Sequence, residues 1–252
     1  MSVRAAETLS PLALDFLWEA LGAGDLPYPL EVRSHGATVD ERALLRRRVH
    51  EELRERGLLD RTGRVEAHIE RSLALIARPE IAIDSVFLPE VGGPAVAAFA
   101  AVAGGDGVLA VQAGGGLLLT PIRAEALVTE VVGMLPGAPR GSETSISLPA
   151  AEFAAGGRGN GVAAEDTKKA LARLVSSPNL RGGQIAVTSR DRMGGRKRGR
   201  VLSWFDKPSG RYLSTMRRGR DGQDWVTVAP ADAPTFRHRV AELVSEVTAP
   251  AR

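Results

Sequence analysis

The sequence predicts an α+β protein with a central antiparallel β-sheet, flanking helical bundles and a quasi-two-fold internal duplication. Three observations lead to this prediction. Apolar residues recur at helical spacing towards both ends of the chain. Short strand patterns separated by glycine-rich turns fill two regions between them, and a helical pattern follows each region. Runs of strands bounded by helices are typical of folds in which helices cover a face of an antiparallel sheet.

Three helices are expected before the first strands. A Ser-Pro pair at 10–11 places an N-cap side chain before a proline at the first helical position. Residues 38–41 form a T-x-x-E capping box, which predicts the start of a second helix. The expected helices span 10–21, 38–56 and 64–77, and apolar residues recur in each at helical spacing.

Alternation with the period of strands replaces the helical spacing after residue 80. Glycine-rich turns at 104–107 and 114–116 separate the strands. Thr120 followed by Pro121 then predicts the start of a helix that extends to Leu135. The strands of this first region are expected over 81–88, 96–102, 108–112 and 117–119.

A similar order of elements recurs behind a Pro- and Gly-rich link at 136–141. Asp232 is the expected N-cap of a final helix whose apolar stripe continues to Val247. The other expected elements of this region are a strand at 144–148, a helix at 165–176, and strands at 184–188, 200–205, 211–217 and 225–228.

The spacing of matching features suggests the duplication. Gly107 lies 26 residues after Ile81, and Gly210 lies 25 residues after Ile185. Because β-meanders followed by helices are common, an accidental match is the alternative. We expect one domain over residues 1–252, with pseudo-repeat halves at approximately 64–135 and 164–248.

Composition excludes several classes of site. The chain has no cysteine, which rules out disulfides, thiolate metal sites and a cysteine nucleophile, and agrees with a reducing cytoplasm. The amphipathic N-terminal segment does not resemble a signal peptide. No apolar stretch reaches the roughly 18 residues of a membrane span. We therefore expect a cytoplasmic protein with no membrane partner.

Motifs for catalysis or cofactor binding are missing at the usual places. His50 is followed by Glu51 without a second histidine four residues on, so the H-E-x-x-H zinc pattern is absent. The sequence holds no G-x-S-x-G elbow and no Gly-Lys pair. The glycines at 156–161 favour a flexible loop over a nucleotide site. We expect no catalytic residue, cofactor or metal, although carboxylate pairs that meet only in space stay open.

The segment from Arg181 to Arg220 is strongly basic. It holds twelve Lys or Arg residues against two acids, Asp191 and Asp206. A basic hairpin could bind a phosphate backbone or an acidic protein, and it could also serve only to keep an edge strand soluble. Nucleic-acid binding through this segment is therefore the alternative function, although no helix-turn-helix, zinc finger or aromatic RNA-binding pattern accompanies it.

A protein-binding module is the function that remains. The apolar run at 86–88 ends the first expected strand, and Val91 and Pro94 follow close behind it. Exposed apolar patches beside a sheet commonly mark protein interfaces. We expect an adaptor that binds another protein and carries out no reaction.

Four segments resemble the EspG proteins of actinobacteria. They are LSPLALDFLW at 9–18, LPYPL at 26–30, GRYL at 210–213 and WVTVAPAD at 225–232. The resemblance implies a quasi-two-fold fold with a central antiparallel sheet. It also implies a cytosolic chaperone that binds the tip of the PPE subunit in PE–PPE heterodimers, keeps it soluble and delivers the pair to the type VII secretion machinery.

The same resemblance implies where the client binds. By element order, the contacts fall on the loop between the second and third strands of the family fold (here 89–95), on the exposed sheet face and on a helical bundle. The basic segment at 194–200 departs from the family pattern. Relatives also occur in actinobacteria that have few PE and PPE proteins, so a different secreted helical hairpin is a further possible client. The choice between monomer and dimer stays open. The implied contact residues are Phe87, Leu88, Val91, Pro94, Val111, Leu117, Leu171 and Leu174.

Overall fold

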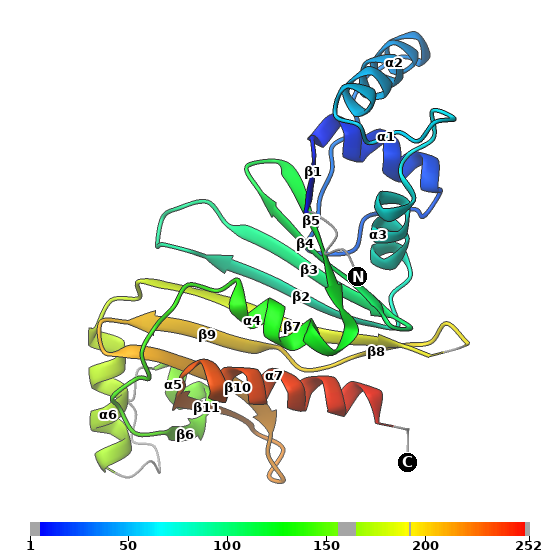
Figure 1. The fold of residues 1–252 in the computed structure, drawn as a ribbon. Coiled ribbons are helices and arrows are strands. Elements are labelled where there is room, and N and C mark those ends of the chain that lie inside the picture. Colours follow the sequence, from blue (N-terminus) through cyan, green and yellow to red (C-terminus); the bar gives the residue numbers. More distant parts are fainter. Residues whose placement is uncertain (1–5, 156–164, 192, 250–252) are drawn as a thin grey trace. The chain divides into compact units, whose positions relative to one another are not determined.

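The computed structural model describes residues 6–155, 165–191 and 193–249 (Figure 1). The chain forms two compact units, each assembled from separate segments. No helix in the described part of the chain is long and apolar enough to cross a membrane. The first unit comprises Met1–Asp84, Val96–Val131 and Ser189–Arg196, and the second comprises Ser85–Ala95, Val132–Thr188 and Lys197–Arg252.

The helices of the first unit begin where the capping signals predicted. The side chain of Ser10 accepts a hydrogen bond from the backbone N–H of Ala13, and Thr38 and Glu41 form both bonds of the capping box. The first helix ends at Gly22, whose φ of 63° lies in the left-handed region that favours glycine. The three helices are α1 (Pro11–Leu21), α2 (Val39–Glu55) and α3 (Ala67–Ala77).

The sheet of the first unit is an antiparallel meander with a short added strand at its edge. Its strands are β3 (Val96–Ala103), β4 (Asp106–Ala113), β5 (Gly116–Arg123) and β1 (Glu7–Leu9), in the order β3-β4-β5-β1. β2 (Ile81–Leu88) precedes the meander, and its first half belongs to this unit. The sequence did not predict β1, because three residues are too few to show alternation.

The expected helix start at Thr120 and Pro121 is wrong. Thr120 pairs with Leu109 and Pro121 with Val108, so β5 continues to Arg123. A 3₁₀ turn, η1 (Ala124–Ala126), leads into the short helix α4 (Leu127–Gly133). Backbone pairing in the meander therefore outweighs the local Thr-Pro signal.

The second unit contains a second antiparallel array. Its strands run in the order β7 (Arg181–Arg190), β9 (Leu202–Lys207), β10 (Gly210–Arg218), β11 (Asp224–Pro230) and β6 (Ile146–Pro149), and β8 (Arg196–Arg198) pairs with β7. Its helices are α5 (Ala150–Ala154), α6 (Glu165–Ser176) and α7 (Ala233–Thr248). Each unit thus contains a meander followed by a helix. This agrees with the expected α+β class, whereas internal duplication stays a prediction.

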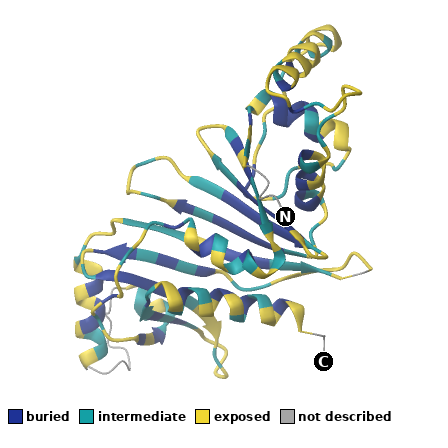
Figure 2. Cartoon of the chain, viewed as in Figure 1, coloured by how far each residue is buried: buried dark blue, intermediate teal, exposed yellow. Residues whose placement is uncertain are grey.

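Helices cover both faces of the β9–β10–β11 array. On one face, Leu171 and Leu174 of α6 pack with Tyr212, Ile146 and Leu148. On the other face, α7 places Phe236 against Trp204, with ring centroids 6.3 Å apart. Strand alternation explains this division, because Tyr212 and its neighbour Leu213 point to opposite faces. Figure 2 shows the strands mostly buried and the outer helix faces exposed.

A buried ion cluster lies among the strands of the second unit. Asp206 is 1% exposed and accepts two hydrogen bonds from Arg211, at 2.7 and 2.8 Å, and one from Arg181 at 2.7 Å. The guanidinium of Arg211 also stacks over Trp204 at 4.6 Å. A buried carboxylate held by two guanidinium groups is satisfied electrostatically, so these three residues act as one structural unit.

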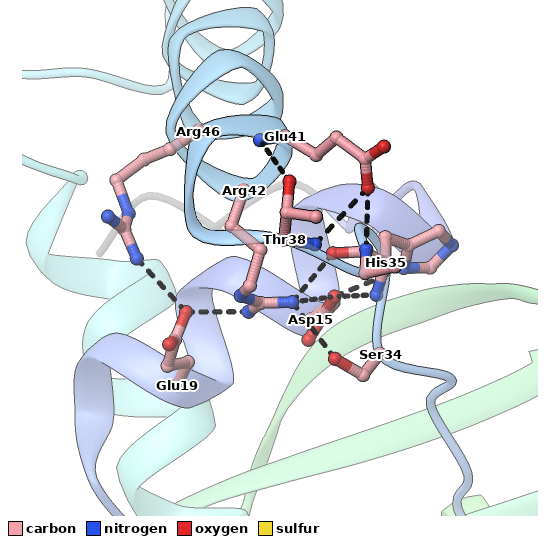
Figure 3. Close-up of polar contacts among 9 residues, drawn as sticks. Asp15, Glu19, Ser34, His35, Thr38, Glu41, Arg42 and Arg46 are labelled. Atoms are coloured by element: carbon pink, nitrogen blue, oxygen red, sulfur yellow. Dashed lines mark hydrogen bonds and ion pairs between the residues drawn. The ribbon is translucent and has the colours of Figure 1, made fainter.

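A polar network joins α2 to α1 in the first unit (Figure 3). The buried carboxylate of Asp15 accepts hydrogen bonds from the backbone N–H of His35 at 2.6 Å and from Arg42 at 3.4 Å. Arg42 also bonds Glu19 at 2.8 Å and lies 4.5 Å above the ring of Phe16. Burial alone raises the pKa of Asp15, but the hydrogen bonds from His35 and Arg42 outweigh it and leave this pKa lowered.

Candidate protein-binding surfaces

The loop between β2 and β3 carries exposed apolar side chains. Leu88, at the end of β2, is 38% exposed, and Val91 is 63% exposed. Pro94 is exposed as well. The backbone N–H of Gly93 donates to the carbonyl of Glu90 at 3.2 Å, which closes a turn within the loop. These three apolar residues therefore lie at the surface of the second unit, and their contact with a partner stays a prediction.

Leu180 joins this loop, and sequence reasoning missed it. Its carbonyl oxygen accepts a hydrogen bond from the N–H of Val91 at 3.0 Å, and its side chain is 44% exposed. Its own N–H donates to the carbonyl of Asp206 at 2.8 Å, so its backbone is fixed on both sides. A single leucine before a strand has no pattern that would reveal this contact. We call Leu88, Val91 and Leu180 the apolar loop surface.

Gly183 permits the close approach of the strands beneath this surface. A Cβ at this position would overlap the Cβ of Phe87 and would lie 2.6 Å from the carbonyl oxygen of Val86. Such distances cannot be accommodated without a backbone shift, so only glycine fits here. This close contact of β7 with the end of β2 fixes the base of the apolar loop surface.

Four of the residues expected to contact a partner are buried instead. Phe87 is 5% exposed and packs against Trp204, with ring centroids 6.1 Å apart. Leu117 is fully buried under the helices of the first unit. Leu171 and Leu174 are 1% and 5% exposed, because they form the inward stripe of α6. Their side chains hold the fold together and offer no surface to a partner in this conformation.

The sheet of the first unit exposes two apolar residues, one of which lies next to a buried residue that was expected to contact a partner. Leu118 is 38% exposed, next to Leu117, which faces the helices. Val111 is half-buried and lies directly opposite Leu118 in the β4–β5 register. Cross-strand partners lie on the same face of a sheet, so Val111 and Leu118 form a small apolar pair there. Val111 is thus partly exposed, whereas Leu117 is buried and its neighbour Leu118 is the exposed residue.

Many cations of the basic segment have structural partners. Arg181 and Arg211 bind Asp206, and Arg200 pairs with Glu246. Lys197 donates to the carbonyl oxygens of Glu246 and Ala249, at 2.7 and 3.3 Å, where a cation is favourable at the C-terminal end of α7. Arg192 lies outside the described residues. Much of the positive charge therefore stabilises the fold of this segment.

Two of the histidines contact carboxylates, and neither contact belongs to a group that could hold a metal ion among the described residues. Within residues 6–155, 165–191 and 193–249, no group of three or more His, Asp or Glu residues could hold a metal ion. His35 contacts Asp15, and His238 lies 3.3 Å from Glu242 within the same helix. The glycines at 156–161 fall outside the described residues. The described residues thus form an α+β scaffold that exposes apolar side chains at the loop between β2 and β3 and on the sheet of the first unit.

Comparison with known proteins identifies the family. The sequence model of the EspG family matches residues 10–242, and the chain therefore belongs to the EspG family. Comparison with curated protein sequences gave no match. Fourteen chains of solved structures match. One is the Mycobacterium tuberculosis type VII secretion system chaperone EspG5, solved in complex with a PE25-PPE41 dimer.

The likeness to EspG5 extends over nearly the whole of both chains. It covers 98% of this chain and 99% of that chain, with a TM-score of 0.72 and 14% sequence identity. At this identity the likeness shows a shared fold. The resemblance drawn from the four sequence segments and the expected α+β class are both confirmed.

Proposed function

We propose that this chain is a non-enzymatic, cytoplasmic chaperone that binds a secreted helical client of the PE–PPE type and keeps it soluble for type VII secretion. Membership of the EspG family supports this proposal. The similar fold of EspG5, which was solved with a PE25-PPE41 dimer, supports the class of client.

The observation that carries the proposal is the apolar loop surface. Leu88, Val91 and Leu180 expose 38%, 63% and 44% of their area, yet Val91 and Leu180 are held together by a backbone hydrogen bond. A fixed apolar patch loses little conformational freedom when a partner covers it. Such a patch suits the shielding of an apolar helical tip, and the pair Val111 and Leu118 offers a second contact area.

Nucleic-acid binding is not retained as a second function. The family and fold comparisons give it no support. Several arginines that suggested it, including Arg181 and Arg211, are bound to Asp206. Asp206 thus neutralises part of their charge inside the protein.

Co-expression tests the proposal. The chain is produced together with a PE–PPE-type pair encoded in the same genome, and the soluble fraction is separated by gel filtration. We expect the client to stay in solution and to elute with this chain. A client that precipitates equally with and without the chain, for each pair tried, contradicts the proposal.

A further inference from the structure

The tip of the β10–β11 hairpin holds arginines that the fold does not use. Arg217, Arg218 and Arg220 are exposed, and within the described residues none of them forms an ion pair. Arg181, Arg200 and Arg211 of the same basic segment are all paired. The three tip arginines therefore remain available to an outside partner.

Trp225 lies beside these arginines and is held in place by the turn. It pairs with Arg217 across the two strands, and its indole N–H donates to Asp221 at 3.3 Å. A Cβ at Gly219 would lie 2.8 Å from two atoms of the indole ring, so only glycine leaves room for the ring here. The other two tryptophans, Trp18 and Trp204, are 5% and 1% exposed.

A shallow depression opens next to the indole. It has a volume of about 380 Å³ and is lined by Gly219, Arg220, Asp221 and Trp225. Its lining is mainly apolar, and it includes one positively and one negatively charged residue, Arg220 and Asp221. This combination accepts an apolar side chain whose neighbours in the chain are polar or charged.

The turn that carries the depression is pre-formed. Gly219 donates to the carbonyl of Gln223 at 2.7 Å, and Gly222 donates to that of Gly219 at 3.1 Å. Gln223 also donates to the carboxylate of Asp221 at 3.0 Å. Binding here would require little ordering of the chain, which lowers the entropic penalty of association.

The surface continues from Arg217 towards α7. Arg217 lines a second depression of about 400 Å³ together with residues of the outer face of that helix, including His238, Glu242 and Ser245. Because Arg217 pairs with Trp225, each depression is lined by one member of the same cross-strand pair. An extended segment of several residues can therefore contact both.

We propose that this hairpin tip is a docking surface for an extended acidic segment of a partner protein. An apolar side chain of the segment fills the depression beside Trp225, and its carboxylates pair with Arg217, Arg218 and Arg220, the geometry for which guanidinium groups are suited. The surface is separate from the apolar loop surface, and the inference does not depend on the client.

A peptide fits this tip better than a nucleic acid or a membrane. Asp221 and Asp224 stand among the three arginines, and this small net positive charge attracts a phosphate backbone or an anionic bilayer, which present only negative charge, less strongly than an all-basic tip would. A peptide carries carboxylates for the arginines and also backbone N–H groups that Asp221 can accept from. The mixture of charges therefore matches a chain with both donors and acceptors.

Tryptophan fluorescence provides the test, because Trp225 is half-buried whereas Trp18 and Trp204 are buried. The full chain is titrated with a short synthetic peptide that alternates glutamate with leucine and glycine. We expect a saturable shift of the emission spectrum. We expect the affinity to fall about tenfold or more in the double variant Arg217→Glu/Arg220→Glu, and to be unchanged in the control Arg47→Glu/Arg48→Glu, which reverses two exposed charges on α2.

The same titration is repeated with anionic vesicles and with single-stranded DNA, and circular dichroism checks that each variant is folded. The proposal is overturned if the acidic peptide gives no saturable change, or if the α2 control weakens binding as much as the tip variant does. It is also overturned if vesicles or DNA bind the tip more tightly than the peptide does.

Discussion

The backbone N–H of Val91 donates a hydrogen bond to the carbonyl oxygen of Leu180, 3.0 Å away. These residues are 89 positions apart in sequence, and both expose much of their side chains. The bond fixes the loop that follows β2 against the residue that precedes β7. The sequence indicated Leu88 and Val91, and this bond adds Leu180 to the apolar loop surface.

The first prediction concerns this patch. Val91→Asp and Leu180→Asp each place a charge where the proposal has an apolar contact that becomes buried on binding. We expect each variant to weaken client binding by about 2 kcal/mol, roughly thirtyfold in Kd, because desolvating an unpaired carboxylate opposes association. Isothermal titration calorimetry with a PE–PPE-type pair measures the change.

Val39→Asp is the matched control, because Val39 is 85% exposed and begins a helix of the first unit. The control should bind the client like the wild type, and all three variants should unfold at similar temperatures. Equal loss of binding in the control and in the loop variants would show that the effect is not specific to the patch.

The second prediction concerns the buried ion cluster. Asp206→Asn leaves the guanidinium of Arg211, whose side chain is 3% exposed, without its charged partner. We expect a loss of roughly 3–5 kcal/mol in the free energy of unfolding, measured by urea denaturation, since an unpaired buried charge is costly. Replacing both residues, Asp206→Leu with Arg211→Met, should cost less than Asp206→Asn alone.

Asp224→Asn serves as the control for the ion cluster, because Asp224 is exposed at the edge of the β10–β11 hairpin. It should change the unfolding free energy little. A similar stability for Asp206→Asn and Asp224→Asn would mean that the cluster does not stabilise the fold.

The sequence predicted most of the regular elements because their signals are local. The capping box at Thr38 and Glu41, the apolar stripe of α7 and the paired glycines at 114–115 each act within a few residues. The start of α4 was misplaced because Pro121 pairs with Val108 in β5, and such pairing is not visible in the local sequence.

The candidate site was harder to predict for a physical reason. Periodicity shows which residues are apolar, but a buried residue and its exposed neighbour, such as Leu117 and Leu118, look alike until the pairing of strands is known. Asp15 and Asp206 gave no signal either, since their partners Arg42 and Arg211 are recognised only once the fold brings them together.

The third prediction concerns acid stability. Hydrogen bonds from His35 and Arg42 outweigh the effect of burial and lower the pKa of Asp15 below its ordinary value of 3.8. A carboxylate with a lowered pKa stabilises the fold above the unfolded-state pKa, and this contribution is lost as the pH falls from about 3.8 through the folded-state pKa. We expect thermal stability to decline in that range.

Asp15→Asn should lower the unfolding temperature at neutral pH and should flatten its further decline in acid. The control is Glu51→Gln, on the exposed face of α2. Melting curves recorded from pH 7 to pH 2.5 measure both effects. An unchanged slope below pH 4 in Asp15→Asn would contradict the role given to this carboxylate.

The fourth prediction concerns Gly141, which lies against the ring of Tyr212. A Cβ at Gly141 would overlap the ring atoms of this fully buried tyrosine. Gly141→Ala should therefore destabilise the protein by about 1–3 kcal/mol through overpacking. Gly137→Ala is the control, since no atom lies within 4 Å of the added Cβ. Urea denaturation that gives equal values for the two variants would exclude tight packing at Gly141.

The most direct test of the proposed client surface is amide hydrogen exchange of the chain alone and in complex with a PE–PPE-type pair. We expect slower exchange in the complex over residues 89–95 and 178–180, which carry Val91 and Leu180, and little change over the hairpin tip at 216–225. Unchanged exchange at 89–95, with new protection confined to other parts of the chain, would show that the client does not bind the apolar loop surface.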